Sequence, residues 1–181
     1  MSDRTASGTA GPEDVDLTGV DVFVGGPIQH AIHGDGFHQP LRRTIRGIVD
    51  AVSAAHGTVF SAHVAERFGA DTSQFSPDQV SVRDFGWMRR CDVFVPVLPV
   101  DGAGELIRTD GTHVELGWAS ALGRPIVVVT PLPMAAGASH LLRGLPSVAD
   151  VTLFDLAEAD ADPAELLRLM EKLGRAAVMA K

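Results

Sequence analysis

Val20-Asp21-Val22-Phe23-Val24, residues 20–24, is a short apolar run that stops at Gly25-Gly26-Pro27. Branched and aromatic residues favour a strand, and glycine followed by proline favours the turn that ends it. Similar runs occur at residues 58–61, 92–98, 125–129 and 151–154. Strands that consist almost wholly of Val, Ile, Leu and Phe are typical of a parallel sheet covered on both faces.

Helical patterns alternate with these strands. Apolar residues recur at helical spacing over residues 40–55, and Ser76 followed by Pro77 predicts the start of a helix that runs to Arg89 or Arg90. The remaining helices are expected at about 111–121, near 141 and at 163–179. The alternation predicts an α/β three-layer sandwich around a five-stranded parallel sheet, flavodoxin-like or Rossmann-like.

Length and composition limit the other possibilities. A chain of 181 residues fits one α/β domain, which we place at residues 19–181. Residues 1–18 are mostly small and polar, so we expect a disordered tail there. The net charge of −8 disfavours a nucleic-acid partner, because binding to a phosphate backbone needs clustered Lys and Arg.

Targeting signals are not evident in the sequence. No apolar run approaches the roughly 20 residues that a membrane span needs, and residues 1–6 lack the apolar core of a secretory signal. The single cysteine, Cys91, fits a reducing compartment and is expected to be a packed thiol. We therefore expect a cytoplasmic protein that has no membrane partner.

Three groups of chemically useful residues follow predicted strands. They are Gly25-Gly26-Pro27 after the first strand, His63 after the second, and residues 108–115 after the third. In open parallel sheets ligands bind beyond the carboxyl ends of the strands, at the point where the strand order reverses. The sequence therefore predicts a ligand site at this edge.

Two carboxylates at this edge allow two interpretations each. Glu115 could complement the helix dipole and complete a capping box with Thr112, or it could face a sugar whose phosphate binds the N–H groups at the helix start. Asp84 could be an ordinary solvated helix residue, or it could be the second carboxylate that glycosidic cleavage needs. Local pattern alone leaves both questions open.

Five motifs considered together carry a family resemblance. They are Val22-Phe23-Val24-Gly25-Gly26-Pro27-Ile28, Ala62-His63-Val64-Ala65-Glu66, Asp84-Phe85-Gly86-Trp87-Met88, Cys91-Asp92-Val93 and Thr109-Asp110-Gly111-Thr112-His113-Val114-Glu115-Leu116-Gly117-Trp118-Ala119. In order and spacing they resemble the nucleoside 2-deoxyribosyltransferase superfamily over about residues 20–155. The likeness is greatest to its nucleotide N-glycosidase branch, which includes 2′-deoxynucleoside 5′-phosphate N-hydrolases and the CMP or hydroxymethyl-CMP hydrolases of blasticidin and mildiomycin biosynthesis.

The resemblance implies a role for each matching residue. Glu115 matches the nucleophile that attacks C1′, and Asp84 matches an aspartate that positions the nucleophile or protonates the leaving base. Thr109 stands where the transferases carry an aspartate for the free 5′-hydroxyl, so a hydroxyl there favours a nucleotide. The other expected substrate contacts are Phe23 (packing on the base), Gly25, Gly26, Ile28, His63, Gly111, Thr112 and Ser139, the last donated by the neighbouring subunit of a homodimer.

Some positions depart from the family pattern. Pro27 and Gln29 stand where relatives often carry Ser and Arg, which leaves contacts to the base and sugar open there. Three histidines, His30, His33 and His38, lie in a longer loop, which we interpret as a lid over the base. Their spacing fits no common zinc-ligand pair and the chemistry implied by the resemblance needs no metal, so we expect neither a metal nor a cofactor.

The predicted activity is hydrolysis of a nucleoside 5′-monophosphate to free base and (deoxy)ribose 5-phosphate, with CMP favoured by the resemblance. A deoxyribosyltransferase and a non-catalytic nucleotide-binding module remain alternatives. A phosphoribohydrolase of the cytokinin-activating kind lacks support, because its glycine-rich loop before the glutamate is absent. A dinucleotide-binding dehydrogenase is disfavoured, since residues 25–27 do not form the G-x-G-x-x-G turn.

Overall fold

The computed structural model describes residues 15–34 and 36–180 of the chain. Its centre is a sheet of five parallel strands in the order β4-β1-β5-β6-β7. A small antiparallel pair, β2 with β3, lies apart from it. The strands are β1 (Asp21–Gly25), β2 (Ile32–His33), β3 (Gly36–Phe37), β4 (Thr58–Phe60), β5 (Val93–Pro96), β6 (Ile126–Thr130) and β7 (Val151–Asp155).

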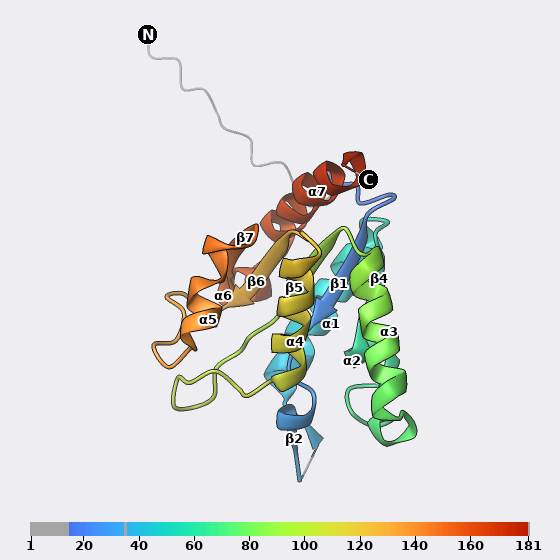
Figure 1. The fold of residues 1–181 in the computed structure, drawn as a ribbon. Coiled ribbons are helices and arrows are strands. Elements are labelled where there is room, and N and C mark those ends of the chain that lie inside the picture. The colour runs from blue at the N-terminus through green and yellow to red at the C-terminus, as the bar shows by residue number, and fades with distance from the viewer. Residues whose placement is uncertain (1–14, 35, 181) are drawn as a thin grey trace.

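Helices cover both faces of the large sheet (Figure 1). One apolar cluster joins the sheet to α1, α6 and α7, and a second joins it to α3, α4 and α5. The α-helices are α1 (Gln39–Ala54), α2 (Ala62–Ala65), α3 (Pro77–Arg90), α4 (Asp110–Ala121), α5 (His140–Gly144), α6 (Leu156–Ala161) and α7 (Ala164–Met179), and the short 3-10 helices are η2 (Gln29–Ala31), η3 (Thr72–Gln74) and η4 (Leu145–Ser147). The predicted three-layer fold is confirmed.

Alternation along β1 shows how the sequence builds these layers. Val22 and Val24 belong to the cluster under α1 and α7, whereas Phe23 belongs to the cluster under α3 and α4. Successive side chains of a strand point to opposite faces, so a fully apolar strand supplies both cores. This is the reason why the strand sequences are apolar at nearly every position.

The start of α3 is fixed by its own sequence. The Gln79 backbone N–H donates to Ser76 Oγ at 3.2 Å, and the Ser76 N–H donates to Gln79 Oε1 at 2.8 Å. This reciprocal capping box confirms the helix start that Ser76 and Pro77 predicted.

The predicted tail is too long at its carboxyl end. Val15 and Leu17 are buried in the first apolar cluster, and the Leu17 N–H donates to the Ala55 carbonyl at 2.7 Å. Residues 15–18 therefore belong to the folded domain, since two apolar side chains in a polar segment are enough to dock it. The rest of the predicted tail, residues 1–14, lies outside the described residues.

The strand order also locates the ligand edge. The chain runs from β1 to β4 on one side, and β5 then pairs with β1 on the other side. This order places the reversal between β1 and β5, where flavodoxin-like sheets bind their ligands. Within the described residues, no helix combines the length and the apolar character needed to cross a membrane.

Candidate active site

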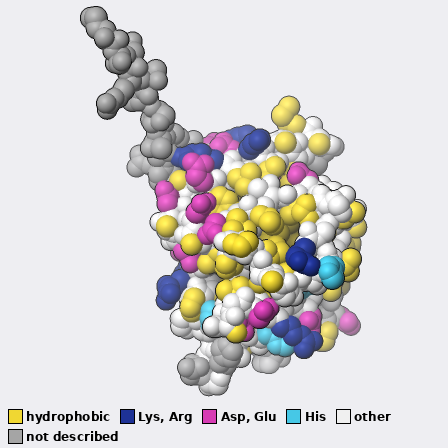
Figure 2. Space-filling view, turned by 90° about the vertical axis from the view of Figure 1, so that its left-hand side faces the viewer, with side chains coloured by type: hydrophobic (Ala, Val, Ile, Leu, Met, Phe, Trp, Pro, Cys, Tyr) yellow, Lys and Arg dark blue, Asp and Glu magenta, His cyan; other side chains and the backbone are white. Residues whose placement is uncertain are grey.

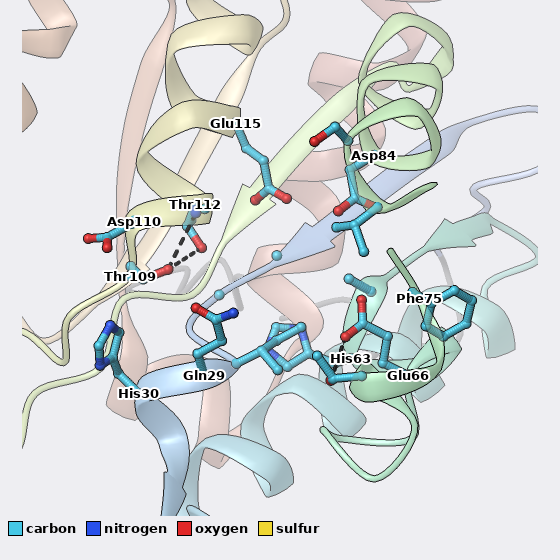
Figure 3. Close-up of a pocket in the computed structure, with 18 of the residues that line it drawn as sticks. Gln29, His30, His63, Glu66, Phe75, Asp84, Thr109, Asp110, Thr112 and Glu115 are labelled. Carbon is cyan, nitrogen blue, oxygen red and sulfur yellow. Dashed lines mark hydrogen bonds between the residues drawn. The ribbon is translucent and has the colours of Figure 1, made fainter. Parts of the chain in front are cut away.

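A cavity of about 440 Å³ opens beyond the carboxyl ends of β1 and β5. This volume lies in the range of pockets that bind small molecules. Its walls come from segments that follow three different strands, as the switch-point rule requires (Figure 3). The structure brings together nine of the predicted site residues in this cavity: Gly25, Gly26, Ile28, His63, Asp84, Thr109, Gly111, Thr112 and Glu115.

Glu115 enters the cavity from α4 and is 8% exposed. Its carboxylate lies against the end of β1, since a Cβ atom added to Gly25 would be 3.0 Å from Glu115 Oε2. Among the described residues, no hydrogen bond or ion pair to this carboxylate is found. Burial, and next the charge of Asp84, raise the pKa of Glu115 to about 8, while Arg83 acts in the opposite direction.

The capping interpretation of Glu115 is wrong. The N-cap of α4 is Thr109, whose Oγ1 accepts from the Thr112 N–H at 3.4 Å. Glu115 therefore lies beyond the first turn, three residues too late to close a capping box with Thr109. A carboxylate that is buried there without a partner needs another explanation, because isolated buried charge is unfavourable.

Asp84 enters the cavity from α3 and is 5% exposed. Arg83 donates from Nε to Asp84 Oδ1 at 2.7 Å and from Nη2 to Asp84 Oδ2 at 3.3 Å. Burial, together with the charge of Glu66, raises the pKa of Asp84 overall, although the hydrogen bonds and charge of Arg83 act in the opposite direction. Asp84 is thus a paired carboxylate beside an unpaired one.

The start of α4 forms the polar end of the cavity. Thr109 Oγ1 donates to Thr112 Oγ1 at 2.6 Å, and the first N–H groups of a helix have no partner within the helix. Asp110 also lines this end, but Arg108 pairs with it through hydrogen bonds of 3.0 and 2.8 Å. Hydroxyls, helix N–H groups and a nearby guanidinium together suit a phosphate.

His63 lies in α2 on the opposite side from Thr109 (Figure 3). Burial lowers the pKa of its imidazole to about 4, so the ring is neutral at physiological pH. Its Nε2 is 3.1 Å from the Pro27 carbonyl oxygen, which only a protonated Nε2 can satisfy. The ring therefore fixes the loop after β1 and forms part of the cavity wall.

Phe23 does not meet its expectation. It is fully buried and packs against Phe94 and Trp87, with ring centroids 5.2 and 5.8 Å away. A side chain with no exposed surface in the core cannot contact a base, so the predicted base contact is wrong. The reason is strand alternation, which turns residue 23 toward α3 and α4.

Ser139 is exposed at the start of α5, where its Oγ accepts from the Leu142 N–H at 3.2 Å. It does not line the cavity of its own chain. Since its predicted contact is with a neighbouring subunit, that role stays a prediction.

Several cavity residues were not among the predicted site residues, although Gln29, His30 and Arg108 lie in segments expected near the ligand. Glu66 and Phe75 border the cavity near Asp84, and Gln29, His30 and Arg108 border it near Thr109. Glu66 stands three residues after His63, a spacing that places both on one helix face and was an available signal. Within residues 15–34 and 36–180, no three His, Cys, Asp or Glu side chains are arranged to hold a metal ion.

Comparison with solved structures confirms the fold that the resemblance implies, since two solved structures share it. The solution structure of BlsM shares 27% sequence identity with this chain, covers 83% of it and 90% of its own length, and has a TM-score of 0.62. The CMP N-glycosidase BcmB of Clostridium botulinum shares 22% identity over 82% of this chain and 98% of its own, with a TM-score of 0.56. No protein-family model matches the chain, and neither does a curated protein sequence.

Proposed function

We propose that this protein hydrolyses the N-glycosidic bond of a nucleoside 5′-monophosphate, with Glu115 as the nucleophile. One observation carries the proposal: a buried carboxylate faces a cavity at the switch point without a hydrogen-bond or ion-pair partner among the described residues. A side chain left in that costly state is expected to interact with a ligand.

The reaction has two balanced steps. An oxygen of Glu115 forms a bond to C1′ while the bond from C1′ to the base nitrogen breaks, and the base leaves with the bonding electron pair and takes up a proton. Water then attacks C1′ of the ester, the bond from C1′ to the Glu115 oxygen breaks, and (deoxy)ribose 5-phosphate and the carboxylate are released. The proton that water loses returns to solvent and balances the one taken up by the base. C1′ gains oxocarbenium character in both steps, and the anions of Glu115 and Asp84 stabilise it.

The far end of the cavity supports a phosphorylated substrate. Thr109, Gly111 and Thr112 offer hydroxyl and N–H groups at the start of α4, one helical turn before Glu115. Binding energy from the phosphate would then hold C1′ against Glu115. A cytidine nucleotide is the favoured substrate, since one of the similar structures is a CMP N-glycosidase.

A panel experiment tests the proposal. The protein is incubated with ribo- and deoxynucleoside 5′-monophosphates and with the matching nucleosides, and released base is measured by chromatography. We expect release from a monophosphate, strongest with CMP, and loss of at least 10³-fold in Glu115→Gln. A variant that retains full turnover would contradict the assignment of Glu115.

The same assay, repeated with an added free base, separates the competing functions. A transferase would convert nucleotide plus a free competing base into a new nucleotide, whereas a hydrolase yields the sugar phosphate. A binding module would retain nucleotide without base release over hours. We propose the hydrolase and expect the sugar phosphate as product.

We also propose that a second copy of the chain completes the site with Ser139. Figure 2 shows the side of the molecule that carries α5 and β7, on which hydrophobic side chains gather. Leu141, two residues after Ser139, is 88% exposed, and Val148 is 72% exposed. Such exposure at the start of α5 fits an isologous contact that carries Ser139 toward a partner.

Subunit mixing tests this contact. If Glu115→Gln and Ser139→Ala are each inactive, a mixed dimer contains one site with both native residues, and mixing should restore part of the activity. Leu141→Asp should yield monomers in sedimentation equilibrium. Wild-type protein that sediments as a monomer at assay concentration would contradict the dimer.

A further inference from the structure

Arg83 joins three segments around the cavity. Its Nη2 donates to Glu66 Oε1 at 2.7 Å, and its Nε donates to Asp84 Oδ1 at 2.7 Å. The guanidinium carbon lies 4.9 Å from the centre of the Trp87 ring and 5.3 Å from that of Phe75. The Arg83 side chain is only 17% exposed. Its planar guanidinium can bind two carboxylates and stack on aromatic rings at the same time, which a lysine ammonium cannot do.

We infer that Arg83 is a positioning residue that keeps Asp84 as a fixed anion beside Glu115, so that Asp84 acts through its charge and not as the acid that protonates the leaving base. The inference rests on the proposed function, and it decides between the two roles that the family resemblance left open for Asp84.

Hydrogen bonding supports the anionic role. Both oxygens of Asp84 accept N–H groups from Arg83, which does not release a proton in proteins. Protonation of Asp84 would remove the negative charge that strengthens both of these hydrogen bonds. Asp84 therefore keeps its charge, and the leaving base must receive its proton from another source, such as water.

Glu66 anchors the other end of this arrangement. Thr72 Oγ1 donates to Glu66 Oε2 at 2.6 Å, and Arg83 occupies Glu66 Oε1, so both carboxylate oxygens are engaged. Glu66 is 2% exposed. A continuous chain of hydrogen bonds thus runs from Thr72 through Glu66 and Arg83 to Asp84 at the cavity. Glu115 is the cavity carboxylate that this chain leaves without an ion-pair partner among the described residues.

The test combines a titration with kinetics. Carboxyl carbons of Asp and Glu are followed by ¹³C NMR from pH 4 to 9 in the full chain, for wild type, Arg83→Gln and the control Arg89→Gln. Arg89 is exposed on the same helix, so the control removes an equal charge at a distance. We expect Asp84 and Glu115 to titrate at higher pH in Arg83→Gln and to stay unchanged in the control.

The kinetic expectation is a loss in kcat. Misplacement of a reacting group by about 1 Å costs roughly 10²-fold, so Arg83→Gln should lose about 10²-fold in kcat with KM within threefold of wild type. Arg83→Lys keeps the charge without the fork and should recover about tenfold of that loss. Arg89→Gln should turn over like wild type.

Two results would overturn the inference. One is an unchanged Asp84 titration in folded Arg83→Gln, or in folded Arg83→Met, a second neutral variant, if the glutamine variant does not fold. The other is a kcat within twofold of wild type in either variant. If wild type releases no base from any nucleotide, the proposed function fails, but the titration still decides whether Arg83 holds Asp84 ionised.

Discussion

Replacing Gly25 by alanine perturbs the nucleophile directly. The added Cβ would lie 3.0 Å from Glu115 Oε2 and 3.2 Å from Phe94 Cε2, whereas ordinary contact begins at about 3.4 Å. Gly25 has no left-handed backbone conformation, so the substitution causes no backbone strain and acts through space alone. Gly25 thus provides a narrow test of where the Glu115 carboxylate lies during catalysis.

The expected size of the effect follows from these distances. Phe94 is fully buried and packed, so Glu115 is the group that must retreat, by about 0.4 Å. If 1 Å of misplacement costs roughly 10²-fold, a shift of this size should lower kcat roughly six- to tenfold. Overpacking at Phe94 should also lower the free energy of unfolding by about 1–3 kcal/mol.

A matched control separates these two effects. Gly117 lies in the same helix as Glu115, and a Cβ added there meets nothing within 4 Å. Gly117→Ala should keep the wild-type kcat and stabilise α4 by up to about 1 kcal/mol, since alanine favours helix. The assay is the initial rate of base release at saturating nucleotide. Wild-type kcat in Gly25→Ala would show that the reacting carboxylate does not lie against residue 25.

Three further outcomes are expected. The value of kcat/KM should rise with pH, reach half of its maximum near pH 8 and level off above that, because the nucleophile must be ionised and burial raises the pKa of Glu115 to about 8. A flat profile from pH 5 to 9 would contradict this. In denaturant unfolding, Glu115→Gln should be more stable than wild type by a few kcal/mol at pH 8 and equally stable below pH 4.5. The reason is that the folded wild type keeps a proton on Glu115 between these pH values, whereas the unfolded chain releases it. Thr109→Asp should raise KM for the monophosphate at least tenfold and leave the nucleoside little affected, since a carboxylate repels the phosphate; equal effects on both substrates would argue against a phosphate at the start of α4.

Local signals in the sequence were sufficient for the fold. The five strands are nearly continuous apolar runs, and Ser76, Pro77 and Gln79 specify the start of α3. The face on which a strand residue lies is harder to predict, because a strand that is apolar throughout does not reveal which side carries which helix. Phe23 was misassigned for that reason, and Val15 and Leu17 were missed because two apolar residues do not form a periodic pattern.

The site was predictable only where its residues follow strands or begin helices. Gly25 and Thr109 satisfy that condition, and Glu115 lies in the helix that Thr109 caps, whereas the contact of Arg83 with Glu66 does not satisfy it. It joins residues 17 positions apart through a segment in which Arg67 and Phe68 take left-handed backbone angles of 49° and 54°. Sequence pattern and residue propensity do not predict this left-handed backbone conformation, since residues other than glycine adopt it rarely.

The arrangement of charge gives a physical reason for the chemistry. Glu66, Asp84 and Glu115 border the cavity, and Arg83 neutralises only part of their combined charge. A cavity with this balance raises the cost of ionising Glu115 while it is empty and lowers the energy of a cation that forms inside it. The oxocarbenium-like sugar is such a cation, whereas the phosphate is held apart at the start of α4. The unfavourable state of Glu115 in the free protein is therefore relieved in the transition state, which is the condition for a rise in kcat.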